Sequence, residues 1–404
     1  MLRRHTLDLG HGTMRWWLIC VTSLALGSAT CAPAAPGRST ERPLDSPMTN
    51  GASGATWEQA WNDLVAAARQ EGTVVVLGPP TPELRQRMPA AFRQRFGITV
   101  EYTGQPSGDF AARLASERSA GIYSADIVIS GSNSMYEVLA GRGQIESGAM
   151  GMLAPLRPVL ILPEVLDTSK YRMGKLIFMD PPGEYVYRQN NSVNRMISLN
   201  TDYVRPGEIQ SWYDLLKPEY RGRIVTYDPL IPGSATNQSA ELYTTLGPEF
   251  VRRLYVDQQP FVTRDHRQSA DLIARGTYPI ALSLPQTEVG RMTEEGFPVR
   301  ALPNPPESPD SLSAQFGHLG ILDRAPHPNA AKLFVNWLLS REGQQLWQNA
   351  QFQVSVRNDL DDSALPPEWL PQPGVDYFDE NAWDFTLNLQ PSIREEMRAL
   401  LNRR

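Results

Sequence analysis

Two short polar loops contain the residue types that could bind an anion. Residues 130–134 read Ser-Gly-Ser-Asn-Ser, residues 232–237 read Pro-Gly-Ser-Ala-Thr-Asn, and each loop lies between a strand pattern and a helical pattern. Small hydroxyl and amide side chains at such positions cap a helix and leave backbone N–H groups free for an anion. Helix capping alone would also explain these residues. Because neither loop contains Asp or Glu, both favour a carboxylate, phosphate or phosphonate group over a bare cation.

The sequence motifs of several enzyme classes are absent. The chain has no G-x-S-x-G, H-E-x-x-H, Walker A or G-x-G-x-x-G sequence. Beyond the N-terminal segment the histidines are His266, His318 and His327, and His327 stands at a proline-flanked helix start, where we expect a structural role. These absences argue against an enzyme, and we expect no catalytic residues, no cofactor and no metal. A secreted hydrolase is the alternative.

The N-terminal residues predict export. Arg15 precedes the apolar run 16–26, and small residues follow up to Cys31. A basic start, an apolar stretch of about 7–15 residues and a small-residue end are typical of a signal peptide. The run is shorter than the roughly 20 residues that span a bilayer. We expect residues 1–31 to be a signal peptide, starting at Met1 or Met14, and the protein to be extracytoplasmic, in the periplasm or on the outer face of the cell membrane.

Cys31 is a candidate lipidation site. Its position resembles the lipidated cysteine of bacterial lipoproteins, but residues 28–30 depart from the usual pattern, so simple cleavage near Ala34 is the alternative. Residues 32–56 are mostly Ala, Pro, Gly, Ser and Thr, which cannot bury enough apolar surface to fold, and they predict a flexible linker. The other cysteine, Cys20, lies in the signal peptide, so the body contains no disulfide.

From residue 57 onward, helical and strand patterns alternate. Apolar residues at helical spacing predict helices, and short apolar runs that end at Gly, Pro or polar residues predict buried strands. Strands that alternate with helices imply an α/β fold with mostly parallel sheets flanked by helices. The net charge of −6 argues against nucleic acid as the main partner. The predicted strands are 73–77, 98–102, 126–129, 196–199, 223–227, 280–284 and 318–322, and the predicted helices are 57–71, 83–96, 110–120, 134–141, 235–246, 270–274, 330–339 and 390–401.

Four blocks of sequence resemble the extracellular solute-binding proteins of ABC importers. They are residues 71–76 (Glu-Gly-Thr-Val-Val-Val), 125–128 (Ala-Asp-Ile-Val), 211–225 and 325–344, and they occur in family order. The closest branch contains ferric-iron, phosphonate and thiamine binders. The resemblance implies a periplasmic-binding-protein type II fold, with two α/β lobes, two crossovers and a ligand trapped in the cleft. It further implies a monomer that delivers its small-molecule ligand to an ABC permease and ATPase complex and touches the membrane only through a lipid anchor.

The same resemblance sets the expected domains and site. We expect lobe 1 over 57–192, lobe 2 with the first crossover over 193–313, and a second crossover, return to lobe 1 and C-terminal helices over 314–404. The resemblance also implies that the two polar loops face one cleft, which His318 could reach from the second crossover. Tyr185 could line the cleft, or belong to an edge strand with alternate aromatics. The expected ligand-binding residues are Gly78, Ser130, Ser132, Asn133, Tyr185, Asn200, Gly233, Ser234, Thr236 and Ser283.

Ferric iron is the alternative ligand. The iron-binding relatives carry two adjacent tyrosines in the second lobe, because phenolate oxygens are hard ligands that suit Fe(III). This sequence has no Tyr-Tyr pair, and residues 285–289, where the pair is expected, read Pro-Gln-Thr-Glu-Val. We therefore expect a small anionic ligand, with an iron importer's binding protein as the alternative.

If Cys31 carries a lipid, Cys31→Ala should move the protein from the membrane fraction to the soluble fraction, because the acyl acceptor is lost. The fold should survive, since the change lies outside the folded body. Cell fractionation with immunoblotting and circular dichroism measure the two effects. A variant that stays in the membrane fraction would contradict lipidation, and a soluble wild type would indicate simple cleavage.

Overall fold

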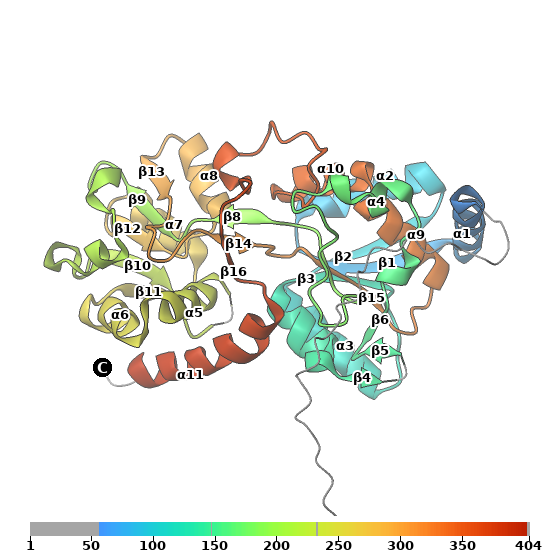
Figure 1. Cartoon of the computed structure of the whole chain (residues 1–404), viewed down its shortest axis with the longest axis horizontal. Helices are drawn as coiled ribbons and strands as arrows, with labels where there is room; N and C mark the ends of the chain where they lie inside the picture. The colour runs from blue at the N-terminus through green and yellow to red at the C-terminus, as the bar shows by residue number, and fades with distance from the viewer. Residues whose placement is uncertain (1–55, 147, 232, 402–404) are drawn as a thin grey trace, which may run out of the picture. The chain divides into compact units, whose positions relative to one another are not determined.

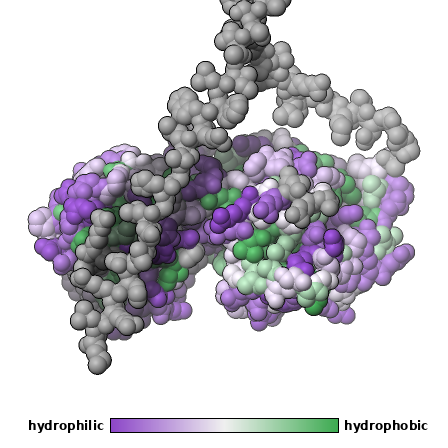
Figure 2. Space-filling model, turned by 90° about the horizontal axis from the view of Figure 1, so that it is seen from below, coloured by the Kyte–Doolittle hydropathy of each residue, from purple (hydrophilic) through white to green (hydrophobic). Residues whose placement is uncertain are grey.

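The computed structural model describes residues 56–401, except Ser147 and Pro232. The predicted signal peptide, the lipidation candidate Cys31 and the predicted linker up to residue 55 lie outside the described residues. Within them, no helix has the length and apolar character needed to cross a membrane. Figure 2 shows a face on which hydrophilic residues predominate and hydrophobic residues form small separate areas.

The first sheet has eight strands and lies between two layers of helices (Figure 1). Its strands are β1 (Thr73–Gly78), β2 (Thr99–Gly104), β3 (Ile127–Ser130), β4 (Ile145–Glu146), β5 (Ala149–Met150), β6 (Leu153–Ala154), β7 (Tyr187–Arg188) and β15 (His318–Leu322), and its main helices are α1 (Trp57–Glu71), α2 (Pro82–Phe96), α3 (Ser107–Ser119), η1 (Ser134–Leu139), α9 (Pro328–Leu339) and α10 (Arg341–Gln351). The order is β2-β1-β3-β15-β6-β5-β4, with β7 also paired to β15. Strands β1, β2 and β3 are parallel, whereas β15 runs antiparallel to β3.

Side chains of the first sheet alternate between its two faces. Val76 and Ile127 pack with α1, α2, α9 and α10, whereas Leu77 and Val128 pack with α3 and η1. All four side chains are fully buried. Burial on both faces explains why the strands read as continuous apolar runs rather than alternating patterns.

The second sheet has five strands and its own core. Its strands are β9 (Ile197–Asn200), β10 (Ile224–Tyr227), β11 (Phe261–Thr263), β12 (Ile280–Leu282) and β13 (Val299–Leu302), and its main helices are α5 (Ser234–Leu246), α6 (Pro248–Arg252), α7 (His266–Ala274) and α8 (Gln286–Glu294). The order is β11-β10-β12-β9-β13, with β10 parallel to β11 and β12, and β9 antiparallel to β12 and β13. Ile224 and Ile280 pack with α5 and α6, whereas Val225 and Ala281 pack with α7 and α8.

A three-stranded sheet lies between the two larger sheets (Figure 1). It consists of β8 (Ser192–Asn194), β14 (Ser311–Ser313) and β16 (Phe378–Asp379). Strand β14 is antiparallel to β8 and parallel to β16. The buried guanidinium of Arg188 donates from Nη1 to both carboxylate oxygens of Asp379, at 2.8 and 2.9 Å. Segments that are distant in the sequence are thereby joined by a charge-assisted pair.

Helix α7 begins at His266, four residues before the predicted start. The carboxylate of Asp265 accepts hydrogen bonds from the backbone N–H groups of Arg267 and Gln268, at 2.8 and 3.3 Å. This cap extends the helix N-terminally beyond its apolar residues. The sequence pattern missed it because the first turn contains few apolar side chains.

The C-terminal helix α11 (Gln390–Leu401) packs against the second sheet's helices rather than the first sheet's. Ile393 and Met397 belong to the same core as Trp212 and Leu242. The expected order over residues 314–404 is a second crossover, a return to lobe 1 and C-terminal helices; α9 and α10 cover the first sheet, and α11 covers the second. An amphipathic pattern identifies the face that a helix buries, but not the surface that covers it.

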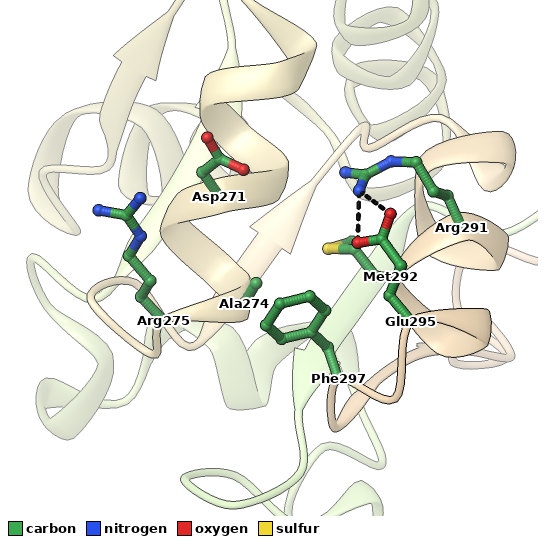
Figure 3. Close-up of a pocket in the computed structure, with 7 residues that line it drawn as sticks. All are labelled: Asp271, Ala274, Arg275, Arg291, Met292, Glu295 and Phe297. Atoms are coloured by element: carbon green, nitrogen blue, oxygen red, sulfur yellow. Dashed lines mark hydrogen bonds and ion pairs between the residues drawn. The ribbon is translucent and has the colours of Figure 1, made fainter.

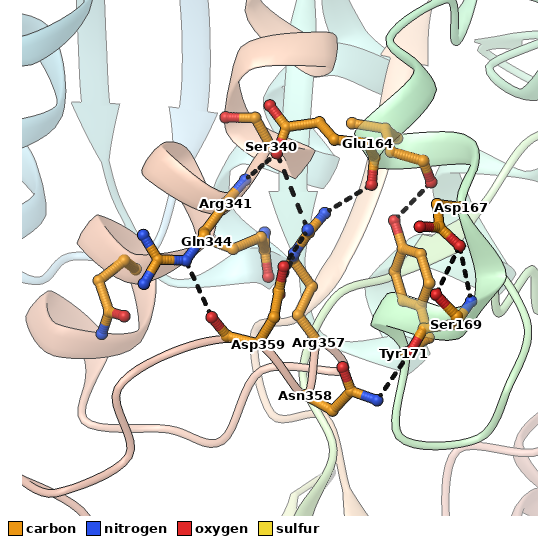
Figure 4. Close-up of polar contacts among 12 residues, drawn as sticks. Glu164, Asp167, Ser169, Tyr171, Ser340, Arg341, Gln344, Arg357, Asn358 and Asp359 are labelled. Carbon is orange, nitrogen blue, oxygen red and sulfur yellow. Dashed lines mark hydrogen bonds and ion pairs between the residues drawn. The ribbon is translucent and has the colours of Figure 1, made fainter.

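Arg357 ties the chain after α10 to the first sheet's layer (Figure 4). Its side chain is 1% exposed, and its Nε and Nη2 each donate to the carboxylate of Asp359 at 2.8 Å. Its Nη1 donates to the carbonyl oxygens of Glu164 and Leu339, at 3.1 and 3.2 Å. Removing this buried cation alone is costly, because its carboxylate and carbonyl partners stay buried without a donor.

Arg357→Ala should lower the free energy of unfolding by roughly 3–5 kcal/mol, because it leaves buried acceptors and a carboxylate without their cation. Arg341→Ala is the matched control, since Arg341 is exposed and its Nε also donates to Asp359, to the backbone carbonyl oxygen at 2.9 Å. The control should cost about 1 kcal/mol or less. Urea titrations followed by circular dichroism measure both, and equal losses would contradict the argument.

Candidate functional site

A cavity of about 800 Å³ lies at the carboxyl ends of parallel strands from both larger sheets. Gly131 follows β3, Tyr227 ends β10, and Ser283 follows β12. Open α/β sheets bind ligands at this edge, and the volume suits a small organic ligand. Lining residues include Pro106, Ser107, Gly108, Gly131, Ser132, Asn133, Glu137, Asn194, Arg195, Tyr227, Gly233, Ser234, Asn237, Gln238, His266, Ser283, Gln286, Ser313, Glu380 and Asn381.

Four α-helices, namely α3, α5, α7 and α8, begin at this cavity, as does the π-helix η1. The N-cap residues of α3, α5 and α8 are Pro106, Gly233 and Pro285, and none of the three provides a side-chain cap. Only α7 among the four has a side-chain cap, from Asp265. The first backbone N–H groups of a helix have no partner inside the helix, and its N-terminus carries about half a positive charge. The cavity wall can therefore donate hydrogen bonds to an anion.

Five of the expected binding residues line the cavity, namely Ser132, Asn133, Gly233, Ser234 and Ser283. The hydroxyl of Ser234 donates to the carbonyl oxygen of Ser283 at 3.1 Å. The hydroxyl of Ser283 donates to the side-chain oxygen of Gln238. Ser283 also has a φ of 60°, in the left-handed region that residues other than glycine seldom adopt. Such conformations occur where the surrounding structure holds them, often at binding sites.

The other five expected residues, Gly78, Ser130, Tyr185, Asn200 and Thr236, lie outside the cavity lining. Asn200 stands at the far end of antiparallel β9, where its amide donates to the carbonyl oxygens of Ile273 and Ala274, at 2.9 and 3.2 Å. Thr236 points back into the loop and donates to the carbonyl oxygen of Pro229 at 3.0 Å. Both side chains stabilise the backbone rather than face the cavity.

The remaining three are held by local packing. A Cβ on Gly78 would lie 2.6 Å from the hydroxyl of Tyr102, so this glycine allows an aromatic ring to approach the strand. Ser130 is fully buried in β3. The hydroxyl of Tyr185 donates to the carbonyl oxygen of Gly148 at 3.4 Å, and its ring packs in the core beneath α3. The prediction of these residues as ligand contacts is therefore corrected.

Arg195 is a cavity residue that the sequence analysis missed. The side chain is 17% exposed, and its Nε lies 3.7 Å from a carboxylate oxygen of Asp310. This Nε has no hydrogen-bond partner among the described residues. A guanidinium whose donors are not all occupied can donate hydrogen bonds to the oxygen atoms of an anionic ligand. No motif surrounds Arg195, so only the fold could identify it.

His266 and Glu380 are further titratable cavity residues that sequence reasoning missed as ligand contacts. The ring of His266 stacks on that of Tyr227, with centroids 4.1 Å apart. Burial lowers the pKa of His266, and the nearby carboxylates of Glu288 and Asp265 oppose this shift. Burial also raises the pKa of Glu380. Both effects favour the neutral forms: the shift of Glu380 makes the cavity less negative, whereas the shift of His266 makes it less positive.

A metal-binding cluster is not found among the described residues: no three His, Cys, Asp or Glu side chains come together to hold an ion. A second, smaller cavity of about 150 Å³ lies between the ends of α7 and α8 (Figure 3). Its lining includes Phe297 and the ion pair between Arg291 and Glu295, whose atoms are 2.7 Å apart. It lies at the C-terminal ends of the two helices whose N-termini face the larger cavity. Those ends do not favour anions.

Comparison with known protein families identifies the family of this chain. A family model described as bacterial extracellular solute-binding protein matches residues 72–353. The chain belongs to this family. The family resemblance of the four sequence blocks is confirmed, and the protein is a solute-binding protein that acts outside the cytoplasm. No curated protein matches it in sequence.

Solved structures of periplasmic binding proteins share the fold of this solute-binding protein. AfuA from Actinobacillus pleuropneumoniae, solved with fructose-6-phosphate, has a TM-score of 0.58 and 20% identity over 82% of this chain and 97% of its own. The Trichodesmium protein IdiA (FutA), solved with iron and citrate, has a TM-score of 0.61 and 17% identity over 81% and 99%. Iron-bound HitA from Pseudomonas aeruginosa has a TM-score of 0.58 and 17% identity over 82% and 98%. These matches confirm the predicted type II α/β fold.

His318 lies behind the cavity of this solute-binding protein rather than in it. The residue is fully buried in β15, and its ring meets that of Tyr136 edge to face, with centroids 5.4 Å apart. Burial lowers the pKa of His318 to about 3, and the positive charge of Arg188 adds to this. The expectation that His318 could reach the cleft is therefore wrong. Its ring is held neutral in the core.

His318 should make the fold acid-sensitive, because an unfolded His binds a proton near pH 6.5 and the folded one only near pH 3. The contribution is complete above pH 6.5 and is lost as the pH falls toward 3. His318→Phe keeps the ring and removes the titration. Between pH 7 and pH 4, wild type should lose roughly 2–3 kcal/mol more unfolding free energy than the variant. Equal losses in urea titrations at the two pH values would contradict this account.

Proposed function

We propose that this protein binds a small organic anion in the cavity between its two larger sheets and delivers it to the permease of an ABC importer. The observation that carries the proposal is the convergence of the N-termini of α3, α5 and α8 on one cavity without side-chain caps. An anion at each such end gains about 0.3–1 kcal/mol, and more when partly buried. An anion that contacts several of them gains from each.

Arg195 supports the same conclusion. It lines the cavity with a positively charged side chain, and its buried Nε lacks a hydrogen-bond partner among the described residues. Glu137 and Glu380 also line the cavity, and burial raises the pKa of Glu380, which weakens its repulsion of an anion. The balance of a guanidinium and three helix ends against two carboxyl groups favours a carboxylate, phosphate or phosphonate.

The size of the cavity bears on the iron alternative. A volume of about 800 Å³ is many times that of a metal ion, and Tyr227 is the single tyrosine in the described lining. The structural neighbours include a protein with a sugar phosphate and one with iron and citrate. We therefore propose an organic anion as the ligand. Iron would then bind as Fe(III) in complex with such an anion.

The remaining parts of the proposal concern the whole protein. We propose that lobes of residues 57–192 and 193–313 close around the ligand, with a return segment from residue 314. We also propose a monomer that has no catalytic activity and is held at the membrane, if at all, by a lipid on Cys31. Native mass spectrometry of the purified protein would identify a co-purified ligand, and a turnover screen would detect hydrolysis.

Arg195→Gln should weaken binding of the co-purified anion, or of fructose 6-phosphate and ferric citrate as probes, by roughly 10- to 100-fold. The reason is that a hydrogen bond from a charged donor contributes about 1.5–3 kcal/mol. Arg95→Gln is the matched control, because Arg95 is an exposed residue of α2 with a side chain 65% exposed. Isothermal titration calorimetry measures all three proteins. A cationic ligand without an acidic group, bound equally by wild type and Arg195→Gln, would overturn the proposal.

A further inference from the structure

Gln390 occupies an unusual place for a polar side chain. It is the first residue of α11, and it is fully buried. It also lies beyond residues 72–353, the span that the family model matches. A buried amide needs hydrogen-bond partners, and the partners of Gln390 belong to the two different halves of the cavity.

The two partners are the asparagines Asn133 and Asn237. Asn133 donates from Nδ2 to Oε1 of Gln390 at 3.4 Å, and Gln390 donates from Nε2 to Oδ1 of Asn237. Asn133 follows β3 of the first sheet, whereas Asn237 belongs to α5 over the second sheet. Both asparagines line the cavity. One side chain therefore joins the two halves of the cavity wall.

The direction of these hydrogen bonds sets what each asparagine can offer a ligand. An asparagine amide has one acceptor oxygen and one nitrogen with two donors. Gln390 occupies the oxygen of Asn237, so the donors of Asn237 stay available. It occupies a donor of Asn133, so the oxygen of Asn133 stays available. Neither available group has a hydrogen-bond partner among the residues that the structure describes.

The segment that carries Gln390 is anchored on both sides. Toward the first sheet, the hydroxyl of Tyr136 donates to the carbonyl oxygen of Asn381 at 2.8 Å, and the rings of Tyr136 and Trp383 lie 4.6 Å apart. Toward the second sheet, Ile393 and Met397 are buried in its core. Figure 1 shows α11 running from the side of β16 along α5 and α6. Glu380 and Asn381 of the same segment line the cavity directly.

We propose that Gln390 is a positioning residue that joins the two halves of the ligand cavity and orients the amides of Asn133 and Asn237 toward the ligand. The inference rests on the proposed function, because it assigns the C-terminal segment a part in the same binding site. It adds that residues 378–401, outside the matched family span, take part in ligand binding. The ligand then meets a donor from one half of the cavity and an acceptor from the other.

The test uses the full chain without added ligand. Gln390→Leu removes both hydrogen bonds at similar volume, and we expect roughly tenfold faster hydrogen exchange in residues 132–139 and 234–239, with a larger radius of gyration in small-angle scattering. Gln390→Glu at pH 5 is the conservative variant. A buried carboxylic acid keeps one donor and one acceptor, so it should restore both measurements to wild-type values.

Gln348→Leu is the matched control, because Gln348 is equally buried but bonds only within the first half. Its Nε2 donates to Asp361 and Asp362 at 3.0 and 3.1 Å, and its Oε1 accepts from the backbone N–H of Ser355 at 3.0 Å. It should leave exchange in both segments and the radius of gyration unchanged. Unchanged values in Gln390→Leu, or no rescue by Gln390→Glu, would overturn the inference. The proposed function fails separately, when wild type binds no anion, and that result does not depend on these measurements.

Discussion

The backbone N–H groups at the start of a helix need a hydrogen-bond acceptor. The candidate binding site of this structure depends on the helices whose N-cap residues provide none. Thr56 and Ser340 cap α1 and α10 with their side chains. At the cavity the equivalent positions are Pro106, Gly233 and Pro285, which cannot do so. Parallel strands bring these helix starts to one edge of each sheet. The fold thus collects unsatisfied donors at one place, where a ligand can stabilise them.

Most of the fold could be predicted because its strands are buried on both faces. A run such as Val74-Val75-Val76-Leu77 has no polar face, and its length and the following Gly78 mark it as a strand in any context. Helix ends set by polar caps were harder to predict, as Asp265 and the early start of α7 demonstrate. The surface that covers α11 was not predictable at all. That contact depends on residues far from it in sequence.

The site was predicted in part, and its errors have physical causes. Ser132 and Ser234 follow strands whose direction was inferred correctly, so both line the cavity. Asn200 ends β9, which is antiparallel to its neighbours, so this end of the strand lies away from the cavity. Arg195, Glu380 and Gln390 carry no motif. Only the pairing of β8, β14 and β16 brings their segments to the cavity. The local sequence could not predict this, because it does not specify how strands distant in the chain pair.

The closure of the first sheet by β15 affects the order of events during synthesis. Strand β3 has β1 on one side, but on its other side it pairs with β15, which appears in the chain only after the whole second sheet. The three-stranded sheet is completed later still, because β16 is near the C-terminus. Contacts this distant form slowly. A nascent chain therefore lacks a complete first sheet until β15 has been made, although the second sheet, with its own core, precedes β15 in the chain.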